Sequence, residues 1–348
     1  MPTSSFDTFF ACTIIVAAAL IATGYICSTM QVRIDNTQDI NQKSYLQAIA
    51  DHIITSPGTP NDWGGESSEN PTDFGLAANT ATIPYQLDVD KISRLNNLNN
   101  FSLSYFDMEN TRELKNIALG ISVSQIMDIT VVQTGNYTSN NTTYFTLSVS
   151  TSIESQPSSA IVNGYVIADN YVYNVTSSTS EIGSGEISVQ VPTAESNTAT
   201  VVVFARASID PRITSYAIFN LSDSTQEIVP PNNFLTLSPL NYTLSLITNS
   251  SGLTIQDCFA LTYAHEQSLA YEHGILSCEI PRIVDGSPMV LFADGLCNGT
   301  YFQEWVSYPQ IPFSIGSNFS GTSKNVFCYE VTINGALYRL EISLGGIP

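Results

Sequence analysis

Charge is what this sequence has least of. Only 12% of its 348 residues are Asp, Glu, Lys or Arg, about half the share that is usual in globular proteins. The 11 basic residues face 31 acidic ones, for a formal net charge of -20, and they form no cluster anywhere along the chain. A protein that neutralises nucleic-acid phosphates needs such clusters. The composition therefore excludes nucleic acid as a partner.

Gly and Pro are also too scarce for several classes of protein. With 20 Gly, 16 Pro and 43% apolar residues, the chain is neither collagen-like nor wholly disordered. Its solubility must rest on Asn, Ser and Thr, because charged residues are so few. The length allows two or three domains with sizeable cores. This composition is typical of an extracellular, β-rich surface protein.

Catalytic signatures are missing as well. The sequence has no GxSxG, no Gly-rich phosphate loop, no HExxH and no Cys/His dyad of recognisable spacing. The densest group of candidate metal ligands is His265, Glu266, Glu272 and His273, but its two His are eight residues apart, which is not the i, i+4 spacing of a helical zinc site. We predict a solvated polar face or hairpin there, no metal, no cofactor and no enzymatic activity.

The longest uncharged run stands near the N-terminus, between Asp7 and Arg33. A helix needs about 20 apolar residues, at ~1.5 Å each, to cross ~30 Å of hydrocarbon. Residues 8–32 therefore predict a membrane-spanning helix, or one held in an equally apolar bundle. A buried core helix is one alternative, although such helices rarely run this long without a polar face. A cleaved secretory signal is another, although residues 1–7 lack the basic n-region.

A one-sided apolar pattern follows the uncharged run. Apolar residues recur at i, i+1, i+4 and i+5, which places them on one stripe of a helix: Tyr45, Leu46, Ile49, Ala50, Ile53 and Ile54. The opposite side carries Gln42, Lys43, Gln47 and Asp51. We predict one helix from about Thr8 to Ser56, with its weak point at residues 35–39 and its end at Pro57 and Gly58. The first half needs lipid or copies of itself around it, whereas the second half lies on a globular domain.

Two short helices are expected before the strands begin. Asp88 is a plausible N-cap for the first, whose apolar face would be Val89, Ile92 and Leu95. Asn110 with Glu113 resembles a capping box for the second, and Gly120 would close it. Trp63, in the turn-rich stretch after the long helix, is expected to pin that loop to the globular body.

From Ile121 onward the apolar period is two, which predicts strands. The runs are 121–132, 143–151, 160–167, 171–175, 186–191, 199–207 and 215–221. Seven short strands separated by turn formers suggest an immunoglobulin-like sandwich. Pro230, Pro231 and Asn232 mark the next boundary, and the β-rich unit after it contains a clear hairpin, residues 329–342, with Asn334-Gly335 as a primed turn.

The expected fold is therefore α+β: a long N-terminal helix, hydrophobic and then amphipathic, followed by two β-rich domains, the first an immunoglobulin-like sandwich. The expected boundaries are a transmembrane or filament-core helix over 1–56, a linker with two short helices over 57–120, the sandwich over 121–229 and a C-terminal β domain over 230–348.

The six cysteines fall into two groups. Cys12 and Cys27 lie in the apolar run, where small buried thiols are expected, with lipidation of Cys27 as an alternative. The last unit contains Cys258, Cys278, Cys297 and Cys328. Their even number in an extracytoplasmic domain predicts two disulfides, with free thiols as the alternative. Three pairings are possible, and the spacings leave all of them open.

Ten N-x-S/T triplets predict glycosylation. They begin at Asn100, Asn136, Asn140, Asn141, Asn174, Asn220, Asn241, Asn249, Asn298 and Asn318. All lie C-terminal to the long helix, which places that side of the membrane outside the cell. Arg33 and Lys43 favour the opposite orientation, because the positive-inside tendency would keep them in the cytoplasm. The acidic residues Asp35 and Asp39 interrupt these two charges.

A family resemblance rests on the long helix and the block after it. The block consists of Ser56-Pro57-Gly58-Thr59-Pro60-Asn61-Asp62-Trp63-Gly64, Phe74-Gly75-Leu76-Ala77 and Leu87-Asp88-Val89-Asp90-Lys91-Ile92-Ser93-Arg94-Leu95. Over about its first third, the chain resembles the archaeal type IV pilin superfamily and related pilin-like surface proteins. The resemblance implies export through a membrane-embedded precursor, helices packed in a filament core and heads outside.

Two features depart from the pattern of that family. Pilin precursors carry a short basic leader, and no Lys or Arg precedes Arg33 here, so either the sequence is already mature or the protein is anchored without processing. Many bacterial pilins also pair an acidic residue near the mature start with a neighbour's terminal amine, and Asp7 is the one candidate for that role.

The sequence thus favours a structural subunit of an extracellular filament, a homo-oligomer joined through its N-terminal helix and held in the membrane before assembly. The helix contacts would use large residues, Phe9, Phe10, Ile14 and Ile15, and small ones, Ala18, Ala22 and Gly24. The alternative is a monomeric, membrane-anchored binding or adhesion module on the cell surface. The amphipathic second half of the helix separates the two, because a plain anchor does not need it.

Overall fold

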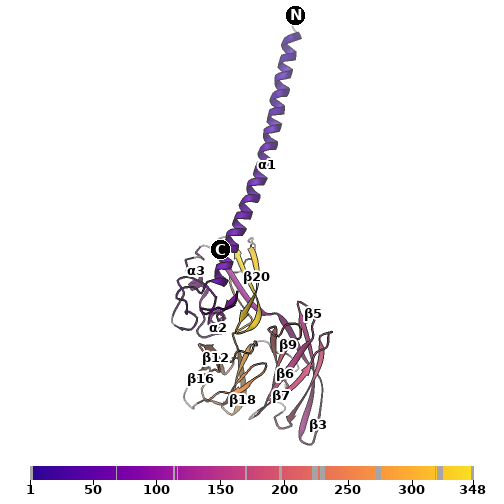
Figure 1. The fold of residues 1–348 in the computed structure, drawn as a ribbon, viewed down its shortest axis with the longest axis vertical. Coiled ribbons are helices and arrows are strands. Elements are labelled where there is room, and N and C mark those ends of the chain that lie inside the picture. Colours follow the sequence, from indigo (N-terminus) through magenta and orange to yellow (C-terminus); the bar gives the residue numbers. More distant parts are fainter. Residues whose placement is uncertain are drawn as a thin grey trace. The chain divides into compact units, whose positions relative to one another are not determined.

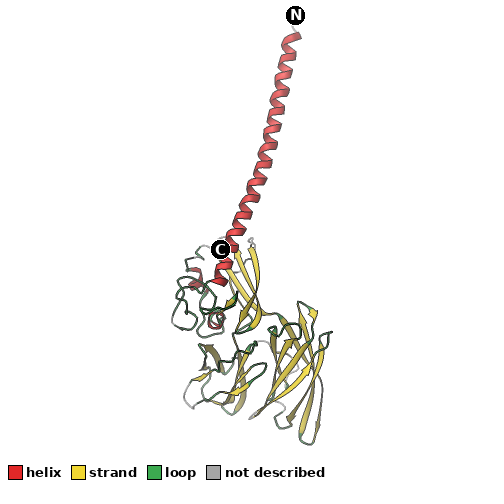
Figure 2. Ribbon diagram, viewed as in Figure 1, coloured by secondary structure: helices red, strands yellow, loops and turns green. Residues whose placement is uncertain are grey.

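The computed structural model describes residues 3–67, 69–112, 114–115, 117–168, 171–195, 198–221, 226–227, 232–271, 276–317, 319 and 324–345. The chain divides into two compact units, residues 1–49 and residues 50–348. The helices are α1 (Thr3–Thr55), α2 (Val89–Ser93) and α3 (Tyr105–Glu109). An apolar N-terminal helix followed by a strand-rich body is the predicted α+β architecture, and it is confirmed (Figure 2).

Helix α1 is one element of 53 residues, which includes the polar stretch 35–39 and confirms the single long helix (Figure 1). Most of the predicted apolar stripe is buried, namely Leu46, Ile49, Ala50, Ile53 and Ile54. Tyr45 is the exception, because 60% of it is exposed. Its phenol and aromatic ring make it the one member of the stripe with a polar end, and such side chains tolerate water.

One predicted short helix is confirmed and the other is wrong. Asp88 caps α2, since its side chain accepts hydrogen bonds from the backbone N–H groups of Asp90 and Lys91 at 3.0 and 3.1 Å. The second helix, α3, comes earlier than predicted, because its N-cap is Ser104 and Asn110 is its C-cap. Gly120 therefore closes no helix and lies in a strand. Glu113, the other half of the expected capping box, is outside the described residues.

Among the described residues, 21 strands form five sheets, and four of these sheets belong to one stack. Sheet I contains β3 (Met127–Ser139), β4 (Thr142–Ile153), β5 (Gln156–Pro157) and β8 (Ser184–Pro192). Sheet II has the order β11 (Gln226–Glu227), β10 (Thr214–Asn220), β9 (Thr200–Ala207), β6 (Ala160–Ala168) and β7 (Tyr171–Ser178). Sheet III has the order β15 (Glu266–Ser268), β14 (Leu253–Leu261), β17 (Met289–Cys297) and β18 (Thr300–Tyr308). Sheet IV has the order β12 (Leu235–Leu240), β13 (Thr243–Thr248) and β16 (Ser277–Glu279).

Three hydrophobic cores hold these four sheets together. Leu147 of sheet I and Val203 of sheet II share the first core. Val202, the next residue of β9, shares the second core with Phe292 of sheet III. Leu291 of sheet III belongs to the third core, with sheet IV. Sheets II and III are therefore buried on both faces, which explains why β9 and β17 read as nearly continuous apolar runs instead of alternating.

Sheet V joins segments that are far apart in the sequence. Its order is β1 (Gln86–Leu87), β20 (Lys324–Ile333), β21 (Ala336–Gly345), β2 (Ala118–Gln125) and β19 (Phe313–Gly316). The predicted strand 121–132 is in fact two strands, because its first half belongs to β2 in sheet V and its second half to β3 in sheet I. Strand pairing in sheet V thus crosses both expected domain boundaries, after residues 120 and 229.

The C-terminal hairpin is confirmed in type and in register. Ile333 pairs with Ala336, so the loop has two residues. Asn334 and Gly335 have φ of 49° and 86°, the left-handed conformations that a type I′ turn requires. Local turn chemistry alone therefore fixed the pairing of the last two strands.

The double burial of sheet II predicts equal sensitivity on its two faces. We expect Val202→Ala and Val203→Ala each to lower the free energy of unfolding by roughly 1 to 3 kcal/mol, since each empties space in a different core. Val132→Ala is the control, because Val132 is 49% exposed and should stay within about 0.5 kcal/mol. Denaturant unfolding in detergent measures all three. A variant at Val202 that matched the control would contradict the stacking of sheet II on sheet III.

Candidate functional site

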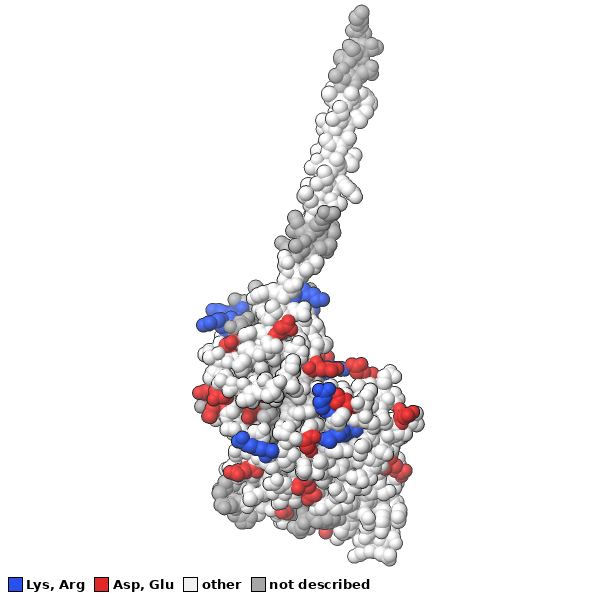
Figure 3. Space-filling view, viewed as in Figure 1, with Lys and Arg blue, Asp and Glu red and all other residues white. Residues whose placement is uncertain are grey.

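The first candidate region is the apolar part of α1, which is uncovered in the described structure. All the residues predicted to make helix contacts are exposed, namely Phe9, Phe10, Ile14, Ile15, Ala18, Ala22 and Gly24. The exposed fraction of the Phe9 side chain reaches 73%. Figure 3 shows no Lys, Arg, Asp or Glu on the white stretch of this helix between its two grey segments. An apolar surface this continuous marks a site for lipid or for another protein surface.

Spacing places several of these side chains on one stripe. Phe10, Ile14, Ala18 and Ala22 are four residues apart, and positions i and i+4 lie one above the other on a helix. Two large side chains are thus followed by two small ones along one line. Gly24 adds another open position, because a Cβ placed there meets no atom within 4 Å. Small residues of this kind let helix backbones approach one another in membranes.

The hydroxyl groups in this segment bond to their own helix. Thr13, Thr23 and Thr29 each donate to the carbonyl oxygen four residues earlier, at 2.7 to 2.9 Å. A hydroxyl that is satisfied in this way can face an apolar medium without loss of hydrogen bonds. Residues Phe9–Gln31 are long and apolar enough to cross a membrane, as a membrane anchor or a signal sequence would be.

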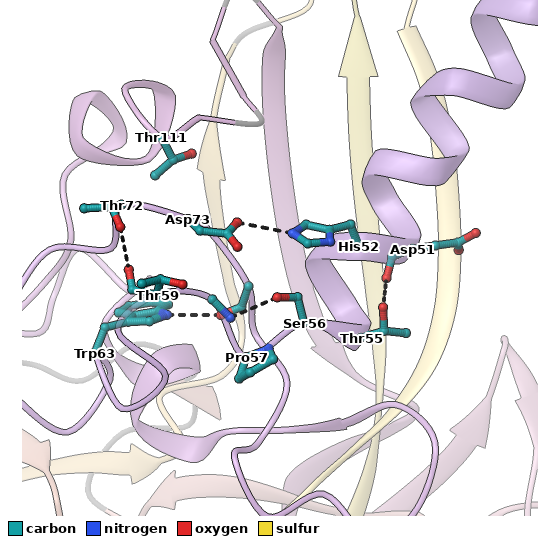
Figure 4. Close-up of polar contacts among 12 residues, drawn as sticks. Asp51, His52, Thr55, Ser56, Pro57, Thr59, Trp63, Thr72, Asp73 and Thr111 are labelled. Atoms are coloured by element: carbon teal, nitrogen blue, oxygen red, sulfur yellow. Dashed lines mark hydrogen bonds and ion pairs between the residues drawn. The ribbon is translucent and has the colours of Figure 1, made fainter.

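The second candidate region is the place where α1 ends in the body (Figure 4). The loop at residues 72–77 satisfies carbonyl groups of the last turn: Leu76 N–H donates to Ile53 O at 2.7 Å, and Ala77 N–H to Ser56 O at 3.0 Å. This approach requires glycine at position 75, because a Cβ there would lie 2.3 Å from Ser56 O. Such bonds replace water at a helix C-terminus.

Side chains on the last turn of α1 also bond to the body. His52 Nε2 lies 3.2 Å from Asp73 Oδ1, and Figure 4 shows the two side chains pointing at each other. On the same turn, the Tyr329 hydroxyl donates to Asp51 Oδ1 at 2.8 Å. Tyr329 belongs to β20, so the C-terminal hairpin takes part in holding the helix end. Residues 50–55, which we call the seat of α1, are thus held by backbone hydrogen bonds and by two side chains.

Trp63 closes the turn-rich loop over this seat. Its indole is fully buried, its Nε1 donates to Gly75 O at 3.1 Å, and its ring lies 5.9 Å from that of Phe74. The expectation that Trp63 pins the loop to the body is confirmed. We call residues 57–77 together with Asp88–Arg94 the collar.

Two buried cations from α2 hold the collar together. The ammonium group of Lys91, whose side chain is fully buried, donates to the carbonyl oxygens of Pro57, Asn61 and Ala77 at 2.7, 2.8 and 2.9 Å. Burial lowers the pKa of Lys91, and the nearby carboxylates of Asp88 and Asp62 act against that shift. All three ammonium protons are used, so this lysine is a structural cross-link.

Arg94 supplies hydrogen-bond donors to the middle of the same loop. Its Nη1 donates to the carbonyl oxygens of Trp63, Glu66 and Glu69, and its Nε to that of Phe101 at 3.0 Å. The guanidinium also lies 5.6 Å from the centre of the Trp63 ring, within the range of a cation–π contact. The pKa of Arg94 is lowered by its burial. Lys91 and Arg94 both belong to the segment after the long helix that resembles archaeal pilins, and the sequence alone gave neither residue a role.

Asp90 joins the collar to the β-sheets. Its Oδ1 accepts hydrogen bonds from the Tyr308 hydroxyl at 2.6 Å and from Asn241 N–H at 2.8 Å. Burial raises the pKa of the Asp90 carboxyl to about 6, although both hydrogen bonds act to lower it. Its two partners belong to sheet III and to the β12–β13 turn, so α2 contacts the loop on one side and the sheets on the other.

The cysteines and the His-rich segment have these places in the fold. Cys12 and Cys27 lie on the uncovered part of α1, where their burial by lipid or by another helix stays a prediction. The structure forms no disulfide; Cys258, Cys278 and Cys297 are buried in one core and Cys328 is exposed on β20.

His265 and Glu266 lie in an exposed hairpin between β14 and β15, as predicted, whereas Glu272 and His273 are outside the described residues. Among the residues that the structure describes, no group of three or more His, Cys, Asp or Glu is placed to hold a metal ion.

Most of the predicted glycosylation sites lie at the surface. The exposed ones are Asn100, Asn136, Asn140, Asn141, Asn174, Asn241, Asn249 and Asn298. Asn220 is half-buried, and Asn318 is outside the described residues. The Nδ2 atom that would carry the sugar is occupied in two of them: Asn249 donates to Asn232 O and Thr236 Oγ1, and Asn298 donates to Ser251 O.

Comparison with known proteins adds no family. No family model matches the chain, and no curated protein matches it. Among solved structures, the chain is similar to HBP35 of Porphyromonas gingivalis, with 12% sequence identity and a TM-score of 0.20, over 54% of this chain and 64% of that one. A likeness at this score carries no argument about fold or function.

The bonds of Lys91 predict a large loss of stability when its charge is removed. We expect Lys91→Met to lower the free energy of unfolding by at least about 3 kcal/mol, since three carbonyl groups lose their donor. Thermal unfolding in detergent, followed by circular dichroism, measures the loss. The matched control is Lys115→Met, because Lys115 is exposed and should shift stability by less than about 0.5 kcal/mol. Equal effects of the two changes would contradict the role of Lys91.

The raised pKa of Asp90 predicts a pH dependence with a definite sign. The pKa is about 6 in the folded chain against an ordinary value of 3.8 for this side chain, so the folded state binds more protons between about pH 4 and 6. The contribution of Asp90 to stability therefore falls as pH rises through that window. We expect the stability of the native chain relative to Asp90→Asn to fall by roughly 1 to 3 kcal/mol between pH 4 and 7. Denaturant unfolding at four pH values measures it. The exposed Asp128, replaced by Asn, serves as control, and a flat difference for Asp90→Asn would refute the prediction.

Proposed function

We propose that this protein is a structural subunit of an extracellular, type IV pilus-like filament, assembled through its N-terminal helix with β-rich heads outward. The observation that carries the proposal is the exposed apolar face of α1, with its stripe of Phe10, Ile14, Ala18 and Ala22. A lipid-facing anchor needs only hydrophobic side chains, whereas two small residues in line with two large ones suit a second helix. The resemblance of the first third of the chain to archaeal pilins supports the same proposal.

The collar favours a subunit over a tethered module. In a filament, the core of helices must carry load from one head to the next, so each helix has to be firmly joined to its own head. Here the same helix α1 contains both the apolar segment and the residues seated in the body. Lys91 and Arg94 place two buried, hydrogen-bonded cations around that seat. A simple membrane tether would not require such a joint.

We further propose that sheets I and II form an immunoglobulin-like domain. If β3, β4, β6, β7, β8, β9 and β10 are labelled A, B, C, C′, E, F and G, the first sheet has the order A–B–E and the second G–F–C–C′. This is the strand order of immunoglobulin-type sandwiches without strand D. The shared core of the two sheets supports the assignment.

The proposed setting is the cell surface, with a membrane-anchored precursor and a glycosylated head. The exposure of eight sequons supports glycosylation. The sites with no described bond on Nδ2 are the strongest candidates: Asn100, Asn136, Asn140, Asn141, Asn174 and Asn241. The low charge of the chain leaves hydration of the head to hydroxyls, amides and sugars. No enzymatic activity, cofactor or nucleic-acid partner is part of the proposal.

The second candidate function is a monomeric, membrane-anchored binding or adhesion module. The same apolar helix favours it, because Phe9–Gln31 is long enough to cross a bilayer by itself. The two functions differ in whether the small residues of α1 matter.

Helix packing predicts that bulk at the small positions blocks assembly. We expect Ala18→Leu or Ala22→Leu to abolish filaments, seen by negative-stain microscopy of shed surface material, while membrane insertion stays intact because Leu only adds hydrophobicity. Val16→Leu is the matched control, since Val16 lies on the opposite side of the helix from Ala18 and is already large. Ile15→Lys should damage both assembly and insertion, because a charge is costly in either apolar setting.

Filaments that persist through both Ala→Leu changes would count against helix packing. Cells of the natural source that carry the protein but no filament would move the anchored module into first place.

A further inference from the structure

Two of the buried cysteines belong to the same core and come from different sheets. Cys258 lies on β14 in sheet III, opposite Ala293, and Cys278 lies on β16 in sheet IV, opposite Leu244. Both are almost fully buried, with exposed fractions of 1% and 3%. The two thiols interact, since each shifts the pKa of the other. The pair thus spans the third core, from one sheet to the other.

The other two cysteines have different neighbours. The Cys297 sulfur lies at the end of β17, 3.9 Å from Ser251 O and 3.9 Å from Asn298 Nδ2. Cys328 is exposed on β20 in sheet V, where Glu341 is its cross-strand partner. No described contact brings a second sulfur to either of them. Of the three pairings that the sequence leaves open, the geometry supports only one bridge.

We propose that Cys258 and Cys278 form a single structural disulfide that ties sheet III to sheet IV, and that Cys297 and Cys328 remain thiols. The register of sheet III separates Cys258 from Cys297, because the partner of Cys258 on β17 is Ala293, four residues before Cys297, whereas Cys278 enters the same core from sheet IV. The bridge would close a loop over residues 259–277, which contains the exposed β14–β15 hairpin with His265 and Glu266.

The oxidation balances with a dithiol-oxidising disulfide of a thiol oxidoreductase as the oxidant. The thiolate of one cysteine of the pair attacks one sulfur of that disulfide, breaks its S–S bond and releases the first thiolate of the oxidant. The thiolate of the other cysteine then attacks the sulfur of the first in the mixed disulfide and releases the second thiolate of the oxidant. Two cysteine thiols are oxidised, the oxidant becomes a dithiol, and the two protons of the cysteines pass to it. Because both sulfurs are buried in the finished core, the bond has to form while sheets III and IV are still closing on each other.

The direct test is peptide mapping of the full chain purified from its natural source. Free thiols are blocked with iodoacetamide in denaturant before digestion without reductant. We expect one cross-linked peptide pair, containing Cys258 and Cys278, and carbamidomethyl groups on Cys297 and Cys328. Blocked Cys258 and Cys278 would overturn the proposal, and so would a bridge from either of them to Cys297 or Cys328. This measurement needs no variant and does not depend on whether the protein forms filaments.

A second measurement uses variants of the full chain in detergent. Reductant should lower the melting temperature of the native chain and of Cys297→Ser/Cys328→Ser by at least about 5 °C, since a disulfide limits the unfolded chain. Cys258→Ala/Cys278→Ala should not respond to reductant at all. A double variant at 258 and 278 that still responds, or a native chain that does not, would overturn the bridge. Loss of filaments in Ala18→Leu would change neither the peptide map nor the response to reductant. The disulfide and the filament proposals can therefore be refuted independently.

Discussion

The ammonium group of Lys91, whose side chain is fully buried, satisfies three backbone carbonyl oxygens. Pro57 and Ala77 stand at the two ends of the loop that folds over the end of α1, and Asn61 lies between them. A loop this irregular has few ladder bonds of its own, and its buried carbonyl groups must find donors elsewhere. One side chain supplies three of them from a single point. Gly64 fits the same constraint, because a Cβ there would lie 2.5 Å from Lys91 Cγ.

The helix that carries Lys91 has only five residues, yet it connects the main parts of the body. Asp88 caps it, Asp90 contacts sheet III through Tyr308, and Arg94 bonds to the middle of the loop at Glu66 and Glu69. These contacts explain how a short helix with little intrinsic stability is maintained. The helix thus joins the loop over the end of α1 to sheet III.

The parts of this fold that could be predicted are those that local chemistry fixes. The long helix follows from an uncharged run and a one-sided stripe, the α2 cap from Asp88, and the last hairpin from Asn334-Gly335. The stacking of four sheets could not be predicted in the same way, because the partner of Val202 is a residue of sheet III far along the chain. A signal was nevertheless present: β9 and β17 are apolar on both faces, and a sheet with one wet face would alternate. The position of α3 was missed because Ser104 and Asn110 both resemble N-caps, and tertiary contacts decide between them.

Sequence reasoning found the candidate site only in part. The apolar positions of α1 were identified, since hydrophobicity is visible in the sequence, whereas the roles of Lys91, Arg94 and Asp90 depend on which carbonyl and hydroxyl groups the fold brings to them. The cysteines show the same limit. An even number predicted bridges, but only the contact of sheets III and IV selects Cys258 and Cys278 from the four.

Sheet V has a consequence for the order in which the chain becomes native. The strands next to β20 and β21 come from residues 86–87 and 118–125, and Tyr329 reaches back to Asp51 on α1. The seat of the helix is therefore incomplete until residues 324–345 have been synthesised and have folded against it. Closing contacts of such long sequence separation is slow. A chain that lacked this hairpin would carry the apolar helix without a finished seat.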